Sequence, residues 1–236
     1  VRFVPRDGSR SSELADLCAS MFRADEQSSG AQEAYDNAFE EAVSGGIGAW
    51  RLRADYEDDE DEENEHQKIW IEPIHDADSS VFFDLDAKRR DKSDAKRCWV
   101  ITKMTVEGYQ EQWGESPTTW PRLIHQSWFD WSPGNYVNVA EYYVVEDTRE
   151  TVHYFRSLTG QQKRYTDSEL AGDPDDQENK PLSEVLAVTG WREMRRKTVK
   201  RKRVHKYIMS GGGVLEDCGY IAGKYIPIVP VYGKRV

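Results

Sequence analysis

The chain has 236 residues, of which 38% are hydrophobic, and its formal net charge at pH 7 is −11. This length allows one hydrophobic core with a smaller satellite, so we expect one or two domains. No apolar run approaches the roughly 18 residues that a membrane span needs, and no signal peptide is recognisable, so we expect no membrane partner. Three well-separated cysteines without a CxxC pair favour a reducing compartment and argue against a cysteine-based zinc site.

Two helices are predicted near the N-terminus. In residues 11–25, SSELADLCASMFRAD, apolar side chains recur at three- and four-residue intervals after a serine that can cap the helix. Residues 28–46 repeat the pattern and end in a Gly-Gly pair, which favours a helix stop. The two apolar faces consist of Leu14, Leu17, Cys18, Met21 and Phe22, and of Ala31, Tyr35, Ala38, Phe39, Ala42 and Val43. We expect the two helices to pack as a pair.

The hydrophobic period then changes from that of a helix to that of a strand. Segments enriched in β-branched and aromatic residues lie at 48–56, 68–74, 81–85 and 97–104. A short helix capped by Thr105 should follow, and then a hairpin of residues 135–147 and 151–157, with a further turn at Thr159 and Gly160. These elements predict an α+β domain, residues 1–165, in which a helix pair accompanies a mostly antiparallel sheet.

The C-terminal third has a different composition. Residues 166–180 are polar and rich in helix breakers, which indicates a flexible connection. Pro181 favours the first turn of a helix, which we expect over residues 181–198. Residues 199–236 read as a small β element whose last strand is confined to a sheet edge, or to a contact with another chain, by Pro227 and Pro230.

Motifs for catalysis, metal binding or phosphate binding are not evident. Residues 55–65 include nine acids, but they lack the turn glycine and ligand spacing of a calcium loop and fit a solvated loop better. The tryptophan-rich residues 113–131 could form a stacking platform, although burial of such rings is more common. We therefore predict no enzymatic activity and no cofactor or metal. The weakest alternative is a hydrolase that uses His75, Asp76, His125 and Asp130.

One segment reverses the charge of the chain. Residues 181–236 hold 12 Lys and Arg against 4 Asp and Glu, a net charge of +8, which leaves −19 for residues 1–180. Most of the positive charge lies in WREMRRKTVKRKRVHKYI, residues 191–208, where Glu193 is the only acid. We predict that DNA or a protein partner contacts its basic residues: Arg192, Arg195, Arg196, Lys197, Lys200, Arg201, Lys202, Arg203 and Lys206. Composition alone leaves a second interpretation open, because basic residues also stabilise a helix C-terminus.

Six segments in the same order resemble a known family. They are SGGIGAWRLRADYED, IEPIHDADSSVFFD, DKSDAKRCWVI, VNVAEYYVV, KRKRVHKYI and YIAGKYIPIVPVYG. Together they resemble the portal proteins of short-tailed bacteriophages and prophages of the Salmonella-phage type, over about residues 4–233. The family's chains are considerably longer, so we expect this sequence to be a fragment. The resemblance implies a wing over 1–165, a first stem helix over 181–198 and most of the clip over 199–236.

The resemblance also implies a function. In that family twelve copies form a ring, the head–tail connector at one capsid vertex, through which double-stranded DNA enters during packaging and leaves during ejection. Terminase docks on the ring first and tail adaptor proteins later, and capsid and scaffold proteins surround it. The implied location is the virion, and the bacterial host cytoplasm during assembly. The alternative from another class is a stand-alone nucleic-acid-binding module that uses residues 192–206.

Overall fold

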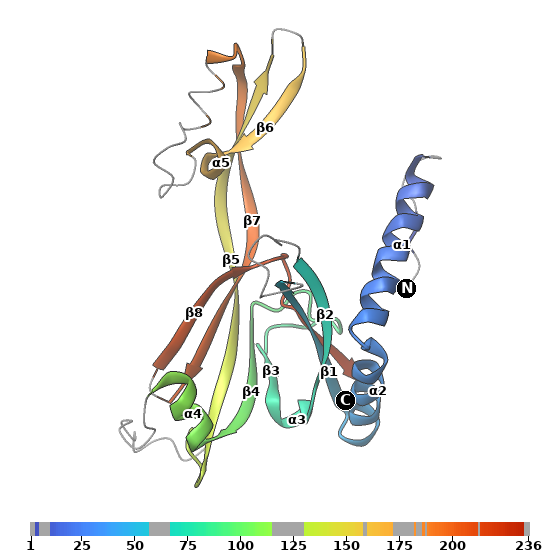
Figure 1. Ribbon diagram of the computed structural model, residues 1–236, viewed down its shortest axis with the longest axis vertical. Coiled ribbons are helices and arrows are strands. Elements are labelled where there is room, and N and C mark those ends of the chain that lie inside the picture. Colours follow the sequence, from blue (N-terminus) through green and yellow to red (C-terminus); the bar gives the residue numbers. More distant parts are fainter. Residues whose placement is uncertain are drawn as a thin grey trace. The chain divides into compact units, whose positions relative to one another are not determined.

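The structure is a computed structural model that describes residues 3–4, 10–56, 67–114, 130–157, 160–171, 182, 186, 188–211 and 213–233. The chain divides into two compact units (Figure 1). The first unit consists of Val1–Val145 together with Val204–Val236, and the second unit consists of Glu146–Arg203.

The predicted helix pair is confirmed in the first unit. Helix α1 spans Arg10–Ser28 and helix α2 spans Ala31–Ser44, and Gly30 between them has the left-handed conformation, with φ of 62°. The apolar pattern predicts the buried faces only in part: Leu14, Leu17 and Met21 are 56–61% exposed, and Phe39 is 65% exposed. The most buried face of α2 is a row of alanines, of which the pattern includes Ala31, Ala38 and Ala42 but not Ala34.

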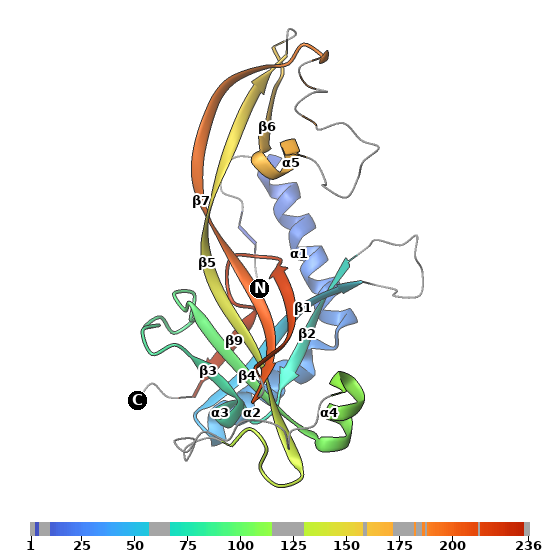
Figure 2. The same cartoon turned by 90° about the vertical axis from the view of Figure 1, so that its left-hand side faces the viewer.

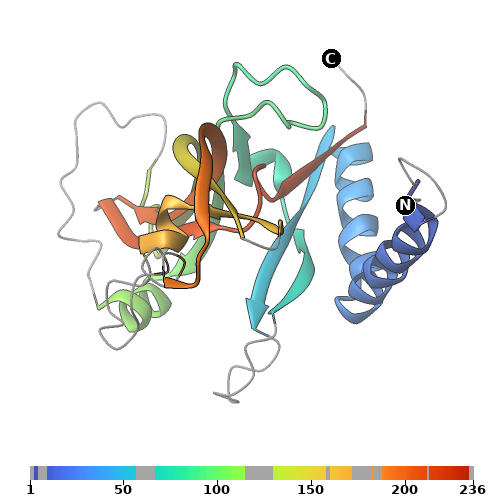
Figure 3. The same ribbon diagram turned by 90° about the horizontal axis from the view of Figure 1, so that it is seen from above.

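The alanine row lies against a three-stranded antiparallel sheet in the order β2-β1-β9 (Figure 3). Its strands are β1, Ile47–Tyr56, β2, Gln67–Ile74, and β9, Ile228–Tyr232. A Cβ atom added to Gly48 would lie only 1.9 Å from the backbone oxygen of Ala38, so the helix and the sheet approach each other very closely at this glycine. Strand β9 is an edge strand, as the prolines predict, and it pairs with β1.

The second sheet has six antiparallel strands. Strand β3 spans Val81–Phe83, β4 spans Arg97–Thr105, β5 spans Tyr136–Arg156, β6 spans Gln162–Thr166, β7 spans Arg192–Ser210 and β8 spans Gly213–Ile221. Their order is β3-β4-β5-β7-β8, with β6 paired to β5. Helices α3, Ala77–Ser80, and α4, Val106–Trp113, belong to the first unit, and Thr105 caps α4 as predicted by accepting from the Gly108 N–H. The fold class is mixed α+β, with N-terminal helices followed by mostly antiparallel sheets.

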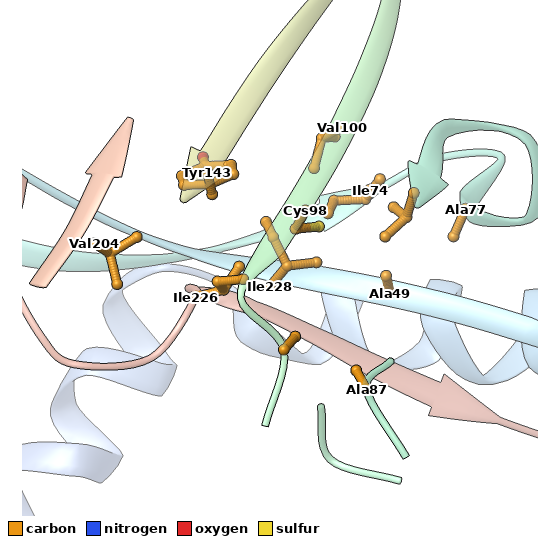
Figure 4. Packing of buried hydrophobic residues seen from close by; sticks show 12 residues of the cluster. Ala49, Ile74, Ala77, Ala87, Cys98, Val100, Tyr143, Val204, Ile226 and Ile228 are labelled. Carbon is orange, nitrogen blue, oxygen red and sulfur yellow. The ribbon is translucent and has the colours of Figure 1, made fainter. Parts of the chain in front are cut away.

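The core of the first unit lies between its two sheets (Figure 4). Successive side chains of a strand point to opposite faces, and one face of β4, β5 and β7 supplies Cys98, Val100, Tyr143 and Val204 to this core. The opposite face carries a row of aromatic rings. Phe82, Trp99 and Tyr142 are register partners across β3, β4 and β5, and the row continues through Tyr207, His205 and Tyr220.

Two sequence predictions for the middle of the chain are wrong. Strand β5 is continuous from Tyr136 to Arg156, so the hairpin predicted around residues 147–150 does not form; the turn at Gly160 does form, where β5 pairs with β6. Residues 166–180 are not wholly a flexible connection, because Thr166 ends β6 and helix α5 spans Asp167–Ala171. Residues 172–180 lie outside the described part of the chain. Figure 2 shows β6 and α5 beside the end of β5.

The helix predicted over residues 181–198 is wrong for residues 192–198, which belong to strand β7. Residues 182, 186 and 188 are helical, and the helical segment then ends at Gly190, which has the left-handed conformation with φ of 78°. The Trp191 N–H donates to the Leu186 carbonyl oxygen over 3.0 Å. This six-to-one hydrogen bond is typical of the Schellman motif, in which a glycine ends the helix. Gly190 thus ends the helix, although the apolar pattern predicts that it continues. The division of the chain into wing, stem and clip stays a prediction.

Candidate interaction surface on strand β7

The nine predicted contact residues all lie on β7 but do not form one surface. Eight of them, from Arg192 to Arg203, belong to the second unit, whereas Lys206 belongs to the first. Because these residues form a strand rather than a helix end, stabilisation of a helix C-terminus does not explain their charge. The basic segment therefore needs another explanation, which depends on what each side chain contacts.

Four of the eight residues in the second unit are held by neighbours within that unit. Arg201 Nε lies 2.9 Å from Glu150 Oε2, and Arg203 Nη2 lies 3.7 Å from Glu150 Oε1. The guanidinium of Arg195 lies 4.7 Å from the centre of the Tyr154 ring, a cation–π distance. Arg196 Nε lies 3.6 Å from Glu193 Oε1, and both side chains are exposed. These side chains already have partners, so they contribute less free positive charge to a binding surface.

The other four basic residues of the second unit are exposed. They are Arg192, Lys197, Lys200 and Lys202, which we call the open cations. Within the described part of the chain, no carboxylate lies within ion-pair distance of any of them. Exposed cations on an extended strand attract anionic partners at long range and lose little solvation before contact. The open cations are therefore the candidate interaction residues of β7.

Lys206 has a different role in the first unit. Its Nζ lies 3.0 Å from Glu141 Oε1, while Arg51 Nη1 and the Tyr143 hydroxyl each lie 3.0 Å from Glu141 Oε2. Arg51 also pairs with Glu72 over 2.8 Å, so the network joins β1 and β2 of one sheet to β5 and β7 of the other. Burial alone would raise the pKa of Glu141, but Lys206 and Arg51 bring that pKa below its ordinary value. Lys206 is therefore a structural residue, and its assignment to a contact surface is not supported.

The residues named for a hydrolase do not form an active site among the described residues. His75 Nδ1 lies 3.2 Å from the side-chain oxygen of Asn37, and the Asp76 backbone N–H donates to Glu41. Asp130 accepts from the Ser132 N–H, and His125 lies outside the described residues. His75 and Asp76 line a cavity of about 380 Å³, yet no described contact joins the two side chains to each other or to Asp130.

The remaining predictions on chemistry have mixed outcomes. Cys18, Cys98 and Cys218 are free thiols, and burial raises the pKa of Cys98. No cluster of three or more His, Cys, Asp or Glu side chains suited to a metal ion occurs in the part of the chain that the structure describes. The helices there include none that is both long enough and apolar enough to cross a membrane. Residues 57–65 of the acidic loop, and most of the tryptophan-rich segment, lie outside the described residues.

Sequence reasoning missed two polar clusters. One is the network around Glu141, and the other is His153, whose ring nitrogens contact Asp167 over 2.6 Å and Glu193 over 3.0 Å. The ion pairs from Glu141 and His153 join residues that are 14–90 positions apart in the chain, so spacing carries no signal for them. Glu141 offers one weak hint, as the only charged residue of the mostly apolar and aromatic segment VNVAEYYVV.

Comparison with known proteins places the chain in a family of structural phage proteins. The chain belongs to the family of phage P22-like portal proteins, whose family model matches residues 1–236. A portal protein of Acyrthosiphon pisum secondary endosymbiont phage 1 is 36% identical over 237 residues, which cover 100% of this chain and 32% of the relative. The chain thus spans about a third of that relative's length. The predicted resemblance to portal proteins is confirmed. This family is structural and non-enzymatic, as predicted.

Proposed function

We propose that this chain is part of the ring-shaped portal through which double-stranded DNA enters the capsid and leaves it. Membership in the portal family supports the proposal, and the open cations of β7 carry it further. The net charge of the chain is −11, and the described residues include no ion-pair partner for these four cations, which favours contact with an anionic surface. Such a surface could be DNA phosphate, an acidic patch of terminase or of a tail adaptor, or the acidic face of a neighbouring copy in the ring.

We favour a protein partner over DNA as the principal contact. A channel that lets DNA slide should hold it weakly, and residues 1–180 carry a charge of −19 that repels a duplex. Because β9 pairs with β1, we also propose that residues 228–232 fold with the residues predicted as the wing. Terminase, adaptors, scaffold proteins and the twelve-fold ring all belong to this proposal.

The decisive experiment changes the open cations in the full-length portal. Arg192→Ser, Lys197→Ser, Lys200→Ser and Lys202→Ser together should reduce DNA packaging or tail attachment by about tenfold, because unpaired charges govern the rate of docking. Packaged genomes per particle and tailed particles per head measure the two steps separately. Arg201 and Arg203 stay unchanged because both pair with Glu150.

A matched control removes the same charge from the first unit. Arg23→Ser, Lys96→Ser, Arg97→Ser and Lys103→Ser change four exposed cations for which the described residues include no ion pair. This variant should package and attach tails at the unaltered level. Equal losses in both variants would show that only net charge matters, and an unaltered test variant would leave the open cations without a docking role.

DNA binding by the 236-residue chain separates the two candidate functions. We expect weak, sequence-independent binding to duplex DNA, with Kd of roughly 0.1 mM or poorer at physiological salt. Fluorescence anisotropy over a salt series measures it, and each substitution that removes a cation from a DNA phosphate should reduce the log–log slope by about 0.9. Sub-micromolar, sequence-selective binding that the four substitutions abolish would instead favour the stand-alone nucleic-acid-binding module.

A further inference from the structure

His153 lies where three elements of the second unit meet. The residue is on β5, and its ring nitrogen Nε2 is 2.6 Å from Oδ1 of Asp167, the first residue of α5. The other ring nitrogen, Nδ1, is 3.0 Å from Oε1 of Glu193 on β7. The imidazole side chain is only 14% exposed, and its ring stacks at 6.4 Å on Phe155 of the same strand. One side chain thus joins β5, the α5 segment that follows β6, and β7.

The two contacts require a particular protonation state. A neutral imidazole donates one hydrogen bond and presents a lone pair at its other nitrogen, whereas the imidazolium donates from both nitrogens. Ionised carboxylates only accept. With a carboxylate oxygen at hydrogen-bond distance from each nitrogen, a neutral ring would direct a lone pair at one of these oxygens. The geometry fits the imidazolium alone, provided that both acids are ionised.

The titratable groups around this site come from β6, β7 and α5. On β7, Arg196 lies 3.6 Å from the same Glu193 oxygen that contacts His153, so this oxygen has two cationic neighbours. From β6, Tyr165 is the register partner of His153, and from α5 Asp167 is the acid that contacts the ring. The hydrogen bond to Asp167 raises the pKa of His153, burial lowers it, and Glu193 raises it again, with a net rise above 6.5.

We propose that His153 is a pH-responsive clamp: as an imidazolium it ties α5 and β7 to β5, and on losing its proton it releases one of the two carboxylates. The direction of the pKa change determines how the stabilisation by this clamp depends on pH. Because the folded-state pKa is raised, the stabilisation is complete below the unfolded pKa, about 6.5, and is lost as pH rises through the higher folded value.

The clamp also affects the charge of β7. Glu193 is the only acid of the basic segment, and the imidazolium holds its carboxylate at the sheet. When the ring is neutral, Glu193 is free to turn toward the arginines beside it, which lowers the positive potential at this end of the strand. The clamp acts within the second unit whether or not the open cations contact a partner.

NMR titration of the imidazole nitrogens in the 236-residue chain tests the clamp. The His153 signals, assigned by their loss in His153→Gln, should show both nitrogens protonated below the ordinary histidine pKa of about 6.5, and a midpoint above that value. Asp167→Asn and Glu193→Gln should each lower the midpoint by about 0.5 on the pH axis, because each removes a charged acceptor. Backbone amide signals of residues 160–171 and 192–196 should shift with the same midpoint, and should not do so in His153→Gln.

His205 provides the matched control. One of its nitrogens lies 2.5 Å from Asp217, but the other faces the Tyr207 hydroxyl, which can donate as well as accept. Because Asp217 contacts His205 and not His153, Asp217→Asn should leave the His153 midpoint unchanged. A His153 midpoint at or below 6.5 in the unaltered chain would overturn the proposal, whatever the variants do. A raised midpoint without amide shifts would show a charged histidine that clamps nothing.

Discussion

Replacing Glu141 by glutamine should lower the free energy of unfolding by about 3 kcal/mol, the usual cost of removing one member of a largely buried ion-pair network. The substitution leaves Arg51 and Lys206 facing a neutral amide, and the side chain of Glu141 is only 19% exposed. Urea denaturation at pH 7, followed by the fluorescence of Trp99 and the other tryptophans, measures the loss. Glu40→Gln, at an exposed site of α2, should change stability by less than about 0.5 kcal/mol.

The free energy of unfolding that Glu141→Gln removes should also depend on pH. The folded-state pKa of Glu141 is below its ordinary value of 4.5, so its contribution is present above pH 4.5 and is lost as pH falls through the folded pKa. The difference between the unaltered chain and Glu141→Gln should therefore shrink in strongly acidic solution. A difference of the same size at pH 7 and at pH 3 would show that packing, and not charge, accounts for the effect.

Gly48→Ala should destabilise the first unit by about 3 kcal/mol, at the upper end of the usual cost of overpacking. The added methyl group would lie 1.9 Å from the Ala38 carbonyl oxygen and 2.7 Å from its carbon, and these backbone atoms cannot rotate away. Helix α2 would have to move off β1, which also loosens the burial of Ala38 and Ala42. Thermal unfolding monitored by circular dichroism measures the change.

Gly45→Ala is the matched control for Gly48→Ala. Gly45 is three residues away and has a negative φ of −100°, and an added Cβ would lie 3.3 Å from its nearest neighbour, the Glu41 carbonyl oxygen. We expect a change of less than about 1 kcal/mol from this substitution. If the two variants unfold at the same temperature, then the close approach of α2 to β1 does not exist in solution.

The sequence predicts the helices and most strands because their patterns are local. Residues 48–56, 68–74 and 97–104 alternate or are rich in β-branched and aromatic side chains, and each is a strand. Burial on α2 could be predicted only in part. The apolar pattern places Ala31, Ala38 and Ala42 on one face with Phe39 and Val43. The helix lies so close to the sheet that these alanines are buried, whereas Phe39 and Val43 are exposed.

The site was only partly predictable for a related reason. Composition locates the basic segment, but it does not indicate that Arg201 and Arg203 share Glu150 or that Lys206 belongs to a buried network. Ion pairs between strands depend on pairing and register, which a single sequence does not show. Gly190 is a local signal for the end of the helix, and the helix predicted over residues 181–198 does not take it into account.

The pairing of β9 with β1 sets the order of events during synthesis. Strand β1 leaves the ribosome about 180 residues before its partner β9, and the core between the sheets also waits for Val204, Ile226 and Ile228. At bacterial rates of roughly 5–20 residues per second, this delay lasts about 10 to 40 seconds. Throughout that interval the edge of β1 that pairs with β9 has no strand partner, and the core between the sheets is incomplete. The nascent chain thus carries an open sheet edge that only the last residues of the first unit can close.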